Sequence, residues 1–419
     1  MDLSIKNDFT QNPSTIMHID LNSCFATIEQ QANPLLRGKP IAVAAFTTPT
    51  GCIVAPSIEA KRYGIKTGMR VKDGKILYPD LIVLPPDPMK YRSIHLRLKA
   101  LLSDYTDQLV PKSIDEFVLD FEGFPAFNKG LVKTGSEIKE RIKKEVGDWL
   151  TVNIGIAPNR FLAKLAAGLH KPDGLDVIDK DNYLKVYSEL ELVELHYIKQ
   201  RNAARLNSAG IFTVMDMYQA PLRQLRSAFQ SILANWWYMK LRGYEVDDRE
   251  FARKSYGNGV ALKDTYVTPE DISPVLQKLV EKMTARMRKA GFKAKGVHLG
   301  IVYRDGSYWH QGKSLTEIVF DSREIYKIMY RLLWHSPYRK PMREIGVTCF
   351  ELVQSDQSQL NLFEDVEKKE RLSVALDSIN EKYGHFVISP ANMMNTDGIV
   401  LDRVAFGGVK ELEELVLAQ

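Results

Sequence analysis

The sequence predicts a multidomain α+β protein, because of its length, its composition and the alternation of short apolar runs with amphipathic stretches. At 419 residues the chain is long enough for about two to four folding units. Apolar residues make up 45% of it and charged residues 26%, values typical of a globular protein with a sizeable core. A composition this apolar excludes a disordered chain.

Several classes of protein are excluded at this level. The longest apolar runs, such as 41–46, are far shorter than the ~18–20 residues that span a bilayer, so we expect no membrane association. The N-terminus is polar and mixed in charge, unlike a secretory signal. Three cysteines are too few for a disulfide framework and lack metal-ligand spacing. We therefore expect a reduced, cytoplasmic protein.

Apolar periodicity and turn residues predict the order of the elements. In the first part they are a buried strand over 15–20, a helix over 22–31, short strands and turns over 37–80, a strand pair over 106–121, a helix over 132–147, a strand over 151–157, a helix from about 159 to 171, and helices over about 181–243. From about 255 to 353 the order becomes strand, helix, two strands, helix and strand. That order is typical of a ferredoxin-like split.

Charge is distributed unevenly along the chain. Residues 253–353 carry 18 Lys and Arg against 10 Asp and Glu, a balance of +8. Residues 354–419 carry 6 against 12, a balance of −6. A basic segment of this kind suits a polyanionic partner such as nucleic acid, since neutralised phosphates release counterions. A solvated surface whose charge varies by chance has the same composition.

Three carboxylates are candidates for the chemistry. Asp20 ends the first buried strand, and Asp115 and Glu116 lie together on another. Neighbouring side chains of a strand point to opposite faces, so Asp115 and Glu116 share a site only if the backbone bends there or both reach around an ion. Converging carboxylates need cations, and oxygen ligands in this number suit Mg²⁺. Taken alone, such short patterns favour surface acids or helix caps.

Six ordered blocks carry a resemblance to a known family. They are HIDLNSCFATIE (18–29), NPLLRGKPIAV (33–43), EAKRYGIKTGM (59–69), PPDPMKYR (85–92), SIDEFVLDF (113–121) and NIGIAPNRFLAKLAAGLHKPDGLDVI (153–178). In order and spacing the chain from about 15 to 353 resembles the Y-family translesion DNA polymerases. The resemblance implies a right-hand polymerase with a ferredoxin-like palm, small fingers, a helical thumb and a ferredoxin-like-split little finger.

The resemblance also implies domain boundaries. They are the palm over 1–29 and 81–180, the fingers over 30–80, a thumb with a degenerate helix–hairpin–helix over 181–250, the DNA-binding little finger over 255–353, and an acidic tail over 354–419.

Site residues carry over position by position. Asp20, Asp115 and Glu116 resemble the metal-binding carboxylates, with the main-chain carbonyl of Leu21 as a further ligand. Asp115 and Glu116 are also the expected catalytic residues. The implied cofactor is a pair of Mg²⁺ ions, for which Mn²⁺ can substitute.

Four residues are expected to contact the incoming nucleotide. Phe25 resembles the steric gate, a ring beneath the sugar that leaves no room for a ribose 2′-hydroxyl. Lys171 and Lys61 resemble the cations that meet the triphosphate, and Tyr91 is a weaker candidate for a substrate contact. A core aromatic at Phe25 and a solvated lysine at Lys171 are the alternatives.

Two segments depart from the family pattern. In the fingers, Ile58 and Lys61 stand where many members have a Tyr and an Arg on the triphosphate. This pattern resembles the UmuC-like branch of SOS mutagenesis rather than the DinB-like branch. In the thumb, only Gly210 remains in the downstream turn, and Lys199–Arg201 occupy the hairpin. Side-chain cations there would replace backbone amides as phosphate contacts.

The basic segment and the tail imply macromolecular partners. Lys293, Lys295 and Arg304 lie beside strands of the little finger and could follow DNA phosphates without reading bases. In the tail, Gln359, Leu360, Asn361, Leu362 and Phe363 resemble the peptide that binds the bacterial sliding clamp. A capping segment folded back on the body is the alternative.

The sequence therefore predicts a low-fidelity, template-directed DNA polymerase for translesion synthesis in DNA repair and the SOS response. Its expected partners are primer-template DNA, deoxynucleoside triphosphates, the sliding clamp and accessory polymerase subunits, and its expected location is the cytoplasm, at the nucleoid. The rival reading is a clamp-bound DNA-binding scaffold with a silent active site. A nucleotide cyclase with similar carboxylates leaves the thumb, the basic segment and the clamp peptide unexplained.

Overall fold

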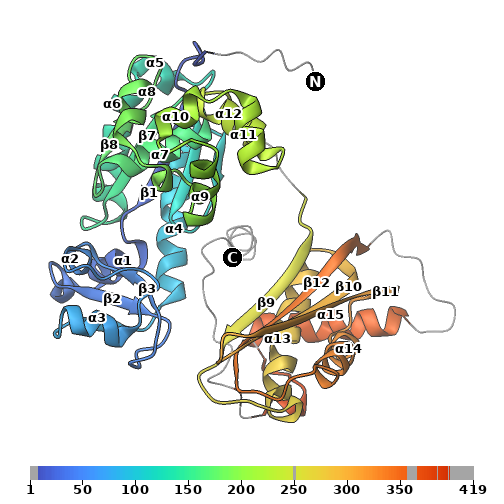
Figure 1. Ribbon diagram of the computed structural model, residues 1–419. Coiled ribbons are helices and arrows are strands. Elements are labelled where there is room, and N and C mark those ends of the chain that lie inside the picture. Colours follow the sequence, from blue (N-terminus) through green and yellow to red (C-terminus); the bar gives the residue numbers. More distant parts are fainter. Residues whose placement is uncertain (1–7, 249–251, 356–365, 385, 395, 397–419) are drawn as a thin grey trace. The chain divides into compact units, whose positions relative to one another are not determined.

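The computed structural model describes residues 8–248, 252–355, 366–384, 386–394 and 396 (Figure 1). These residues form two compact units, which divide near residue 250. In the part of the chain that is described, no helix is long and apolar enough to cross a membrane.

A five-stranded sheet lies at the centre of the first unit, with strand order β5-β6-β1-β7-β8. β1 is the middle strand and pairs antiparallel with both β6 and β7. The strands are β1 (Ile16–Leu21), β5 (Leu109–Pro111), β6 (Glu116–Asp120), β7 (Val152–Ala157) and β8 (Leu175–Val177). The central position of β1 brings its end residue Asp20 between two neighbouring strands.

Alternate residues of β1 belong to two different cores. Met17 and Ile19 pack in the core that includes residues of helices α1, α4 and α6, whereas Ile16 packs in the core of α7 and the helices that follow it. Because side chains alternate across a strand, His18 and Asp20 share the α7 face with Ile16. The helices next to this sheet are α1 (Cys24–Ala32), α4 (Pro88–Ser103), α5 (Pro125–Lys129), α6 (Leu131–Arg141) and α7 (Arg160–Leu169).

Helix α7 lies directly on β7. A Cβ atom built on Gly155 of β7 would be 2.1 Å from the carbonyl oxygen of Ala163 and 2.2 Å from the amide nitrogen of Ala167. Asn159 is the N-cap of this helix, and its side chain accepts a 2.7 Å hydrogen bond from the amide of Leu162. The missing side chain at Gly155 therefore sets the distance between helix and sheet.

A small three-stranded sheet, with order β3-β2-β4, forms a separate part of the first unit. Its core includes Ala42, Ile53 and Ile65. Its elements are β2 (Ile41–Ala44), β3 (Ile53–Pro56), α2 (Ile58–Arg62), α3 (Val71–Leu77) and β4 (Ile82–Leu84).

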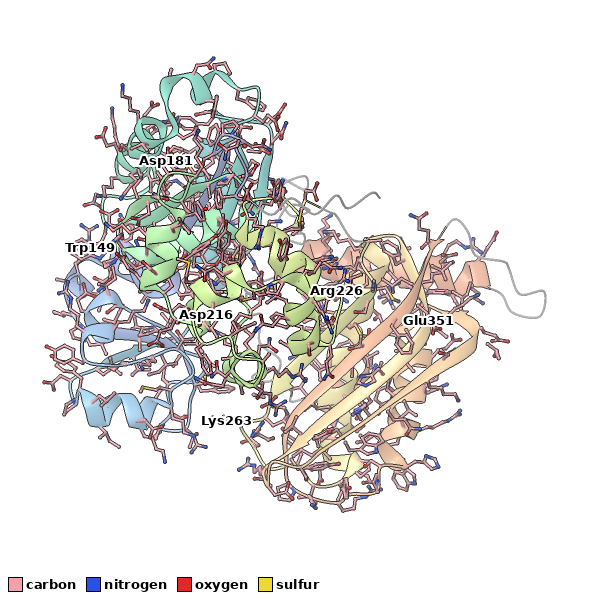
Figure 2. The ribbon with its side chains drawn as sticks, turned by 45° about the horizontal axis from the view of Figure 1, so that its top comes forward. Trp149, Asp181, Asp216, Arg226, Lys263 and Glu351 are labelled. Carbon is pink, nitrogen blue, oxygen red and sulfur yellow. The ribbon has the colours of Figure 1, made fainter. Side chains whose placement is uncertain are left out.

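Five helices complete the first unit: α8 (Tyr183–Glu189), α9 (Gln200–Ser208), α10 (Val214–Gln219), α11 (Leu222–Phe229) and α12 (Leu233–Leu241). Gly210 makes the turn between α9 and α10 with φ of +77°. Asp216, labelled in Figure 2, caps α10 by accepting hydrogen bonds from the amides of Phe212 and Thr213 at 3.0 and 2.9 Å. Arg226 of α11, also labelled there, donates to Asn235 of α12 at 2.9 Å.

The second unit has the order of elements expected from the sequence. They are β9 (Ser255–Ala261), α13 (Pro269–Lys289), β10 (Phe292–Tyr303), β11 (Tyr308–Val319), α14 (Ser322–Trp334) and β12 (Met342–Gln354). The strands form one antiparallel sheet, β11-β10-β12-β9. Side chains of α13 and α14 pack with it in one core, to which Leu276, Leu279 and Met283 contribute from the apolar stripe of α13.

Glycines lie opposite one another across this sheet. Gly259 of β9 faces Gly346 of β12, which in turn faces Gly300 of β10. A Cβ atom on Gly346 would meet nothing nearer than 3.8 Å. Glu351, labelled in Figure 2, bridges strands by accepting a 3.0 Å hydrogen bond from Ser314 of β11.

The tail contributes a helix to the second unit. Helix α15 (Val366–Tyr383) is attached by acidic side chains: Asp377 forms a two-pronged ion pair with Arg288 at 2.7 and 2.8 Å. Glu370 pairs with Lys293 of β10 at 2.8 Å. Lys293, which we expected to follow DNA phosphate, is therefore buried beneath the tail helix, and part of the basic charge is neutralised within the chain.

Candidate active site

The three predicted carboxylates converge at one end of β1 and β6. Asp20 lies directly opposite Glu116 in the antiparallel register, so the two side chains share a face of the sheet. Residues 113–115 form a bend just before β6 begins. The amide of Leu21 donates to the carbonyl of Asp115 at 2.9 Å and holds this bend against β1. The bend removes the strand alternation that would have sent Asp115 and Glu116 to opposite faces.

Burial makes the ionised form of Asp115 less stable. Burial raises the pKa of Asp115 to about 6, and the nearby charges of Asp20 and Glu116 add to the increase, while a hydrogen bond from Ser113 Oγ opposes it. Asp115 holds its proton up to this pH because its negative charge would be poorly solvated and would lie near two other carboxylates. Such a place favours a bound cation.

Lysines neutralise the other two carboxylates. Lys171 donates to Asp20, and Lys164 of α7 donates to both oxygens of Glu116 at 2.8 and 2.7 Å. Lys171 was expected near the triphosphate. The pairing of Lys164 with Glu116 was not anticipated from the sequence; Lys164 lies on α7, whereas Lys171 follows the end of this helix at Leu169.

A pocket of about 250 Å³ opens beside these groups. Its lining includes Asp20, Leu21, Asp115, Lys61 and Lys171, five of the residues predicted for the site. Glu116, Phe25 and Tyr91 are not among the lining residues. The remainder of the wall comes from Asn22, Ser23, Cys24, Val54, Ala55, Pro56 and Thr67. The pocket thus lies between the end of β1 and the small sheet, and both carboxylates and lysines line it.

Phe25 and Tyr91 belong to a hydrophobic core of the first unit. Their rings stack with centroids 4.2 Å apart and planes inclined by 10°. The Tyr91 hydroxyl donates to Glu29 at 2.9 Å and accepts from the amide of Asp87 at 3.1 Å. With its hydroxyl engaged and its ring buried, Tyr91 supports the ring of Phe25 rather than the pocket wall.

Lys61 reaches the pocket from a short helix. Ser57 caps α2 by accepting from the amide of Ala60 at 3.2 Å, and this places Lys61 in the last turn. Burial lowers the pKa of Lys61, the charge of Lys171 lowers it further, and that of Asp20 partly restores it. Two lysines at one pocket repel each other, so an anion between them would relieve the repulsion.

The donor set suits a hard divalent cation. Within the described residues, no group of three or more His, Cys, Asp and Glu side chains is gathered so that it could hold a metal ion as it stands. Asp20 and Glu116 are each turned to a lysine instead. Three carboxylates and a main-chain carbonyl are nevertheless all oxygen donors, the type that Mg²⁺ and Mn²⁺ prefer. The chemistry of the residues fits the predicted cofactor.

Known proteins share this sequence and this fold. Residues 19–168 match the impB/mucB/samB family, and residues 253–362 match the C-terminal domain of that family. A DNA polymerase IV from Pelotomaculum thermopropionicum is 31% identical over 395 residues, which are 93% of this chain and 97% of the relative. The chain belongs to the Y-family of DNA polymerases.

Further relatives agree with this membership. DNA polymerase IV 1 of Bacillus subtilis is 33% identical and covers 88% of this chain and 90% of the relative. Among solved structures, a Y-family DNA polymerase chimera of Dbh and Dpo4 matches with a TM-score of 0.71 and 25% identity over 81% of this chain and 99% of that one. The predicted right-hand fold and the predicted enzyme class, a DNA-directed DNA polymerase, are thereby confirmed.

The expected branch was wrong. Ile58 and Lys61 suggested the UmuC-like branch, yet the relatives that align along about nine-tenths of the chain are named DNA polymerase IV, the DinB-like branch. Ile58 and Lys61 are two side chains of one short helix, whereas the similarity to these relatives extends over the whole sequence. The predicted clamp peptide, 359–363, lies outside the described residues.

Proposed function

We propose that the protein is a template-directed, low-fidelity DNA polymerase that synthesises across damaged bases. The observation that carries the proposal is the convergence of Asp20, Asp115 and Glu116 beside a pocket lined by Lys61 and Lys171, in a member of the Y-family. The primer 3′-hydroxyl attacks the α-phosphate of a deoxynucleoside triphosphate, a phosphodiester bond forms, and pyrophosphate leaves.

Asp20, the Leu21 carbonyl, Asp115 and Glu116 would hold two Mg²⁺ ions, or Mn²⁺ in their place. When bound, such ions activate the hydroxyl and neutralise charge on the leaving oxygens. The raised pKa of Asp115 supports this assignment, because the free site holds more negative charge than it can solvate. The other side chains align the two substrates, and alignment supplies much of the acceleration.

The lysines and the stacked aromatics have separate roles. Lys171 and Lys61 bind the triphosphate, and Lys171 can leave Asp20 for phosphate oxygens once a metal takes its place. Phe25 acts as the steric gate against a ribose 2′-hydroxyl, and the Tyr91 ring stacked on it keeps it from turning aside. Ile58 cannot donate to a phosphate, so triphosphate binding relies on point charges.

The remaining parts hold DNA and partners. We assign the palm to 1–29 and 81–180, the fingers to 30–80, the thumb to 181–250 and the little finger to 255–353. The thumb and little finger grip primer-template DNA by its backbone, so binding is salt-sensitive and tolerant of sequence. Residues 359–363 bind the sliding clamp, accessory subunits add to activity, and the protein works in the cytoplasm at the nucleoid.

Primer extension by the purified protein tests the function. With Mg²⁺, undamaged and abasic templates should both be extended, and the Asp115→Ala/Glu116→Ala variant should lose at least about 10³-fold in rate because charge neutralisation is lost. Equal inertness of wild type and variant, with DNA binding intact and clamp loaded, would favour the silent scaffold instead.

A further inference from the structure

Lys164 and His18 form a polar group next to the proposed metal carboxylates that the mechanism above does not use. Lys164 lies on α7 and reaches across β1 to Glu116 on β6. His18 lies on β1, the strand next to β6, and is only 2% exposed. Its Nε2 is 3.9 Å from Glu116 Oε2.

His18 lacks the hydrogen bonds that a buried imidazole normally makes. Among the described residues neither ring nitrogen has a partner. An imidazole in its neutral form has one ring nitrogen that donates a hydrogen bond and one that accepts it. Buried polar atoms left without partners call for an explanation.

Lys164 holds both oxygens of Glu116, the oxygens that a cation would need. The pair is partly shielded from water, with 27% of the Lys164 side chain and 21% of the Glu116 side chain exposed. An ammonium and a divalent cation compete for the same carboxylate. When Glu116 turns to a cation, the Lys164 ammonium needs another acceptor. His18 Nε2 is 3.9 Å from Glu116 Oε2, the oxygen to which Lys164 Nζ donates at 2.7 Å.

We propose that Lys164 is the resident counter-ion of Glu116 in the metal-free enzyme, and that His18 accepts a hydrogen bond from Lys164 once Glu116 binds a divalent cation. Both are positioning residues, since neither touches substrate. The inference rests on the proposed role of Glu116 as a metal ligand. It accounts for a buried histidine that has no hydrogen-bond partner among the described residues, and for a lysine that occupies both ligand oxygens of Glu116.

Direct measurement of Mn²⁺ binding tests the proposal without any turnover. Electron paramagnetic resonance reports free Mn²⁺ during titration of the protein in the absence of DNA and nucleotide. Lys164→Met should bind Mn²⁺ more tightly, by about tenfold, because the competing cation is gone. The gain should disappear in the Glu116→Gln background. Lys164→Arg should weaken binding, because a guanidinium grips both oxygens.

His18→Leu should weaken Mn²⁺ binding several-fold in the wild-type background and have no effect in Lys164→Met, where no ammonium needs an acceptor. Lys133→Met, an exposed lysine of α6, is the matched control and should change nothing. Unchanged or weaker Mn²⁺ binding in a folded Lys164→Met would overturn the inference alone. A wild-type protein that binds no Mn²⁺ would overturn the proposed metal site together with it.

Discussion

The sheets of the two units differ in how they carry charge. In the first unit, charged side chains belong to the strands themselves: Asp20 and Glu116 lie opposite each other, and a lysine from the covering helix reaches over them. In the second unit, the ion pairs with α15 join α13 and β10 to a helix of the tail. The Lys164–Glu116 pair therefore depends on the distance between helix and sheet, whereas the α15 pairs, whose acids are 31% and 38% exposed, tolerate small shifts of that helix.

The largest difference between the two units is expected when one glycine of each sheet is replaced by alanine and the free energy of unfolding is measured. Gly155→Ala puts Cβ within 2.1 Å of the backbone of α7, so the helix must move and carry Lys164 with it. We expect a loss of about 3 kcal/mol in the free energy of unfolding, together with most of the polymerase activity. Urea denaturation followed by circular dichroism measures the first effect.

Gly346→Ala is the matched change in the second unit. Its Cβ would meet nothing nearer than 3.8 Å. We therefore expect the free energy of unfolding to change by no more than about 0.5 kcal/mol and nucleotide insertion to be unimpaired. Equal losses at Gly155 and Gly346 would show that the close contact of α7 with β7 is unimportant.

Neutralising one carboxylate in each unit should change stability in opposite directions. Burial raises the pKa of Asp115 from 3.8 to about 6, so the folded protein binds this proton more tightly than the unfolded chain. Stability therefore falls as pH rises from about 4 to about 6, and the whole cost is present above pH 6. In EDTA at pH 7.5, Asp115→Asn should be about 2 kcal/mol more stable than wild type, and at pH 4 nearly equal to it.

Asp305 of the second unit provides the opposite case. Its ion pair with Lys340 at 2.8 Å and its hydrogen bonds from Ser307 hold its pKa below the usual range. The stabilisation that ionised Asp305 gives the folded protein is present above about pH 4 and is lost as the pH falls. Asp305→Asn should therefore make the folded protein less stable at pH 7.5. Thermal melts of both variants at pH 4 and 7.5 decide the signs. A destabilised Asp115→Asn at pH 7.5 would contradict the comparison.

The smallest effect is expected at the tail helix. Asp377→Asn/Glu381→Gln removes the partners of Arg288 and Lys289, and exposed or half-exposed ion pairs contribute about 1 kcal/mol or less. Hydrogen exchange in α15 should become about fivefold faster while α13 stays protected. Glu367→Gln, which removes an exposed charge from the same helix, should leave exchange unchanged. Faster exchange throughout α13 would instead indicate that α15 supports the core.

Much of the fold and the position of the carboxylates followed from the sequence. The alternation in 16–21 assigns β1 to a buried strand, and the helical spacing of Leu276, Leu279 and Met283 identifies the inner face of α13. These features are local, because the apolar face of each element is set by the spacing of apolar residues within that element.

Contacts between elements far apart in the chain could not be predicted from the sequence. The reach of Lys164 to Glu116 depends on how closely α7 approaches the sheet, and Tyr91 was expected at the substrate but is buried against Phe25. The side of α15 that docks on the second unit could not be found by looking for an apolar stripe, because acidic side chains such as Asp377 make the contacts. The branch assignment failed because it weighed Ile58 and Lys61 above similarity along the rest of the chain.

The short connection to β12 limits how far residues 359–363 can lie from the second unit. Gln354 ends β12 and Val366 begins α15, so the peptide at 359–363 is joined on both sides to elements of one unit. A chain spans at most ~3.3–3.6 Å per residue, and seven residues separate Asn361 from Gln354. Any protein that binds the peptide must therefore hold its site within about 25 Å of the end of β12. This limit comes from the covalent connection to β12, so it holds whether or not the ion pairs of α15 are formed.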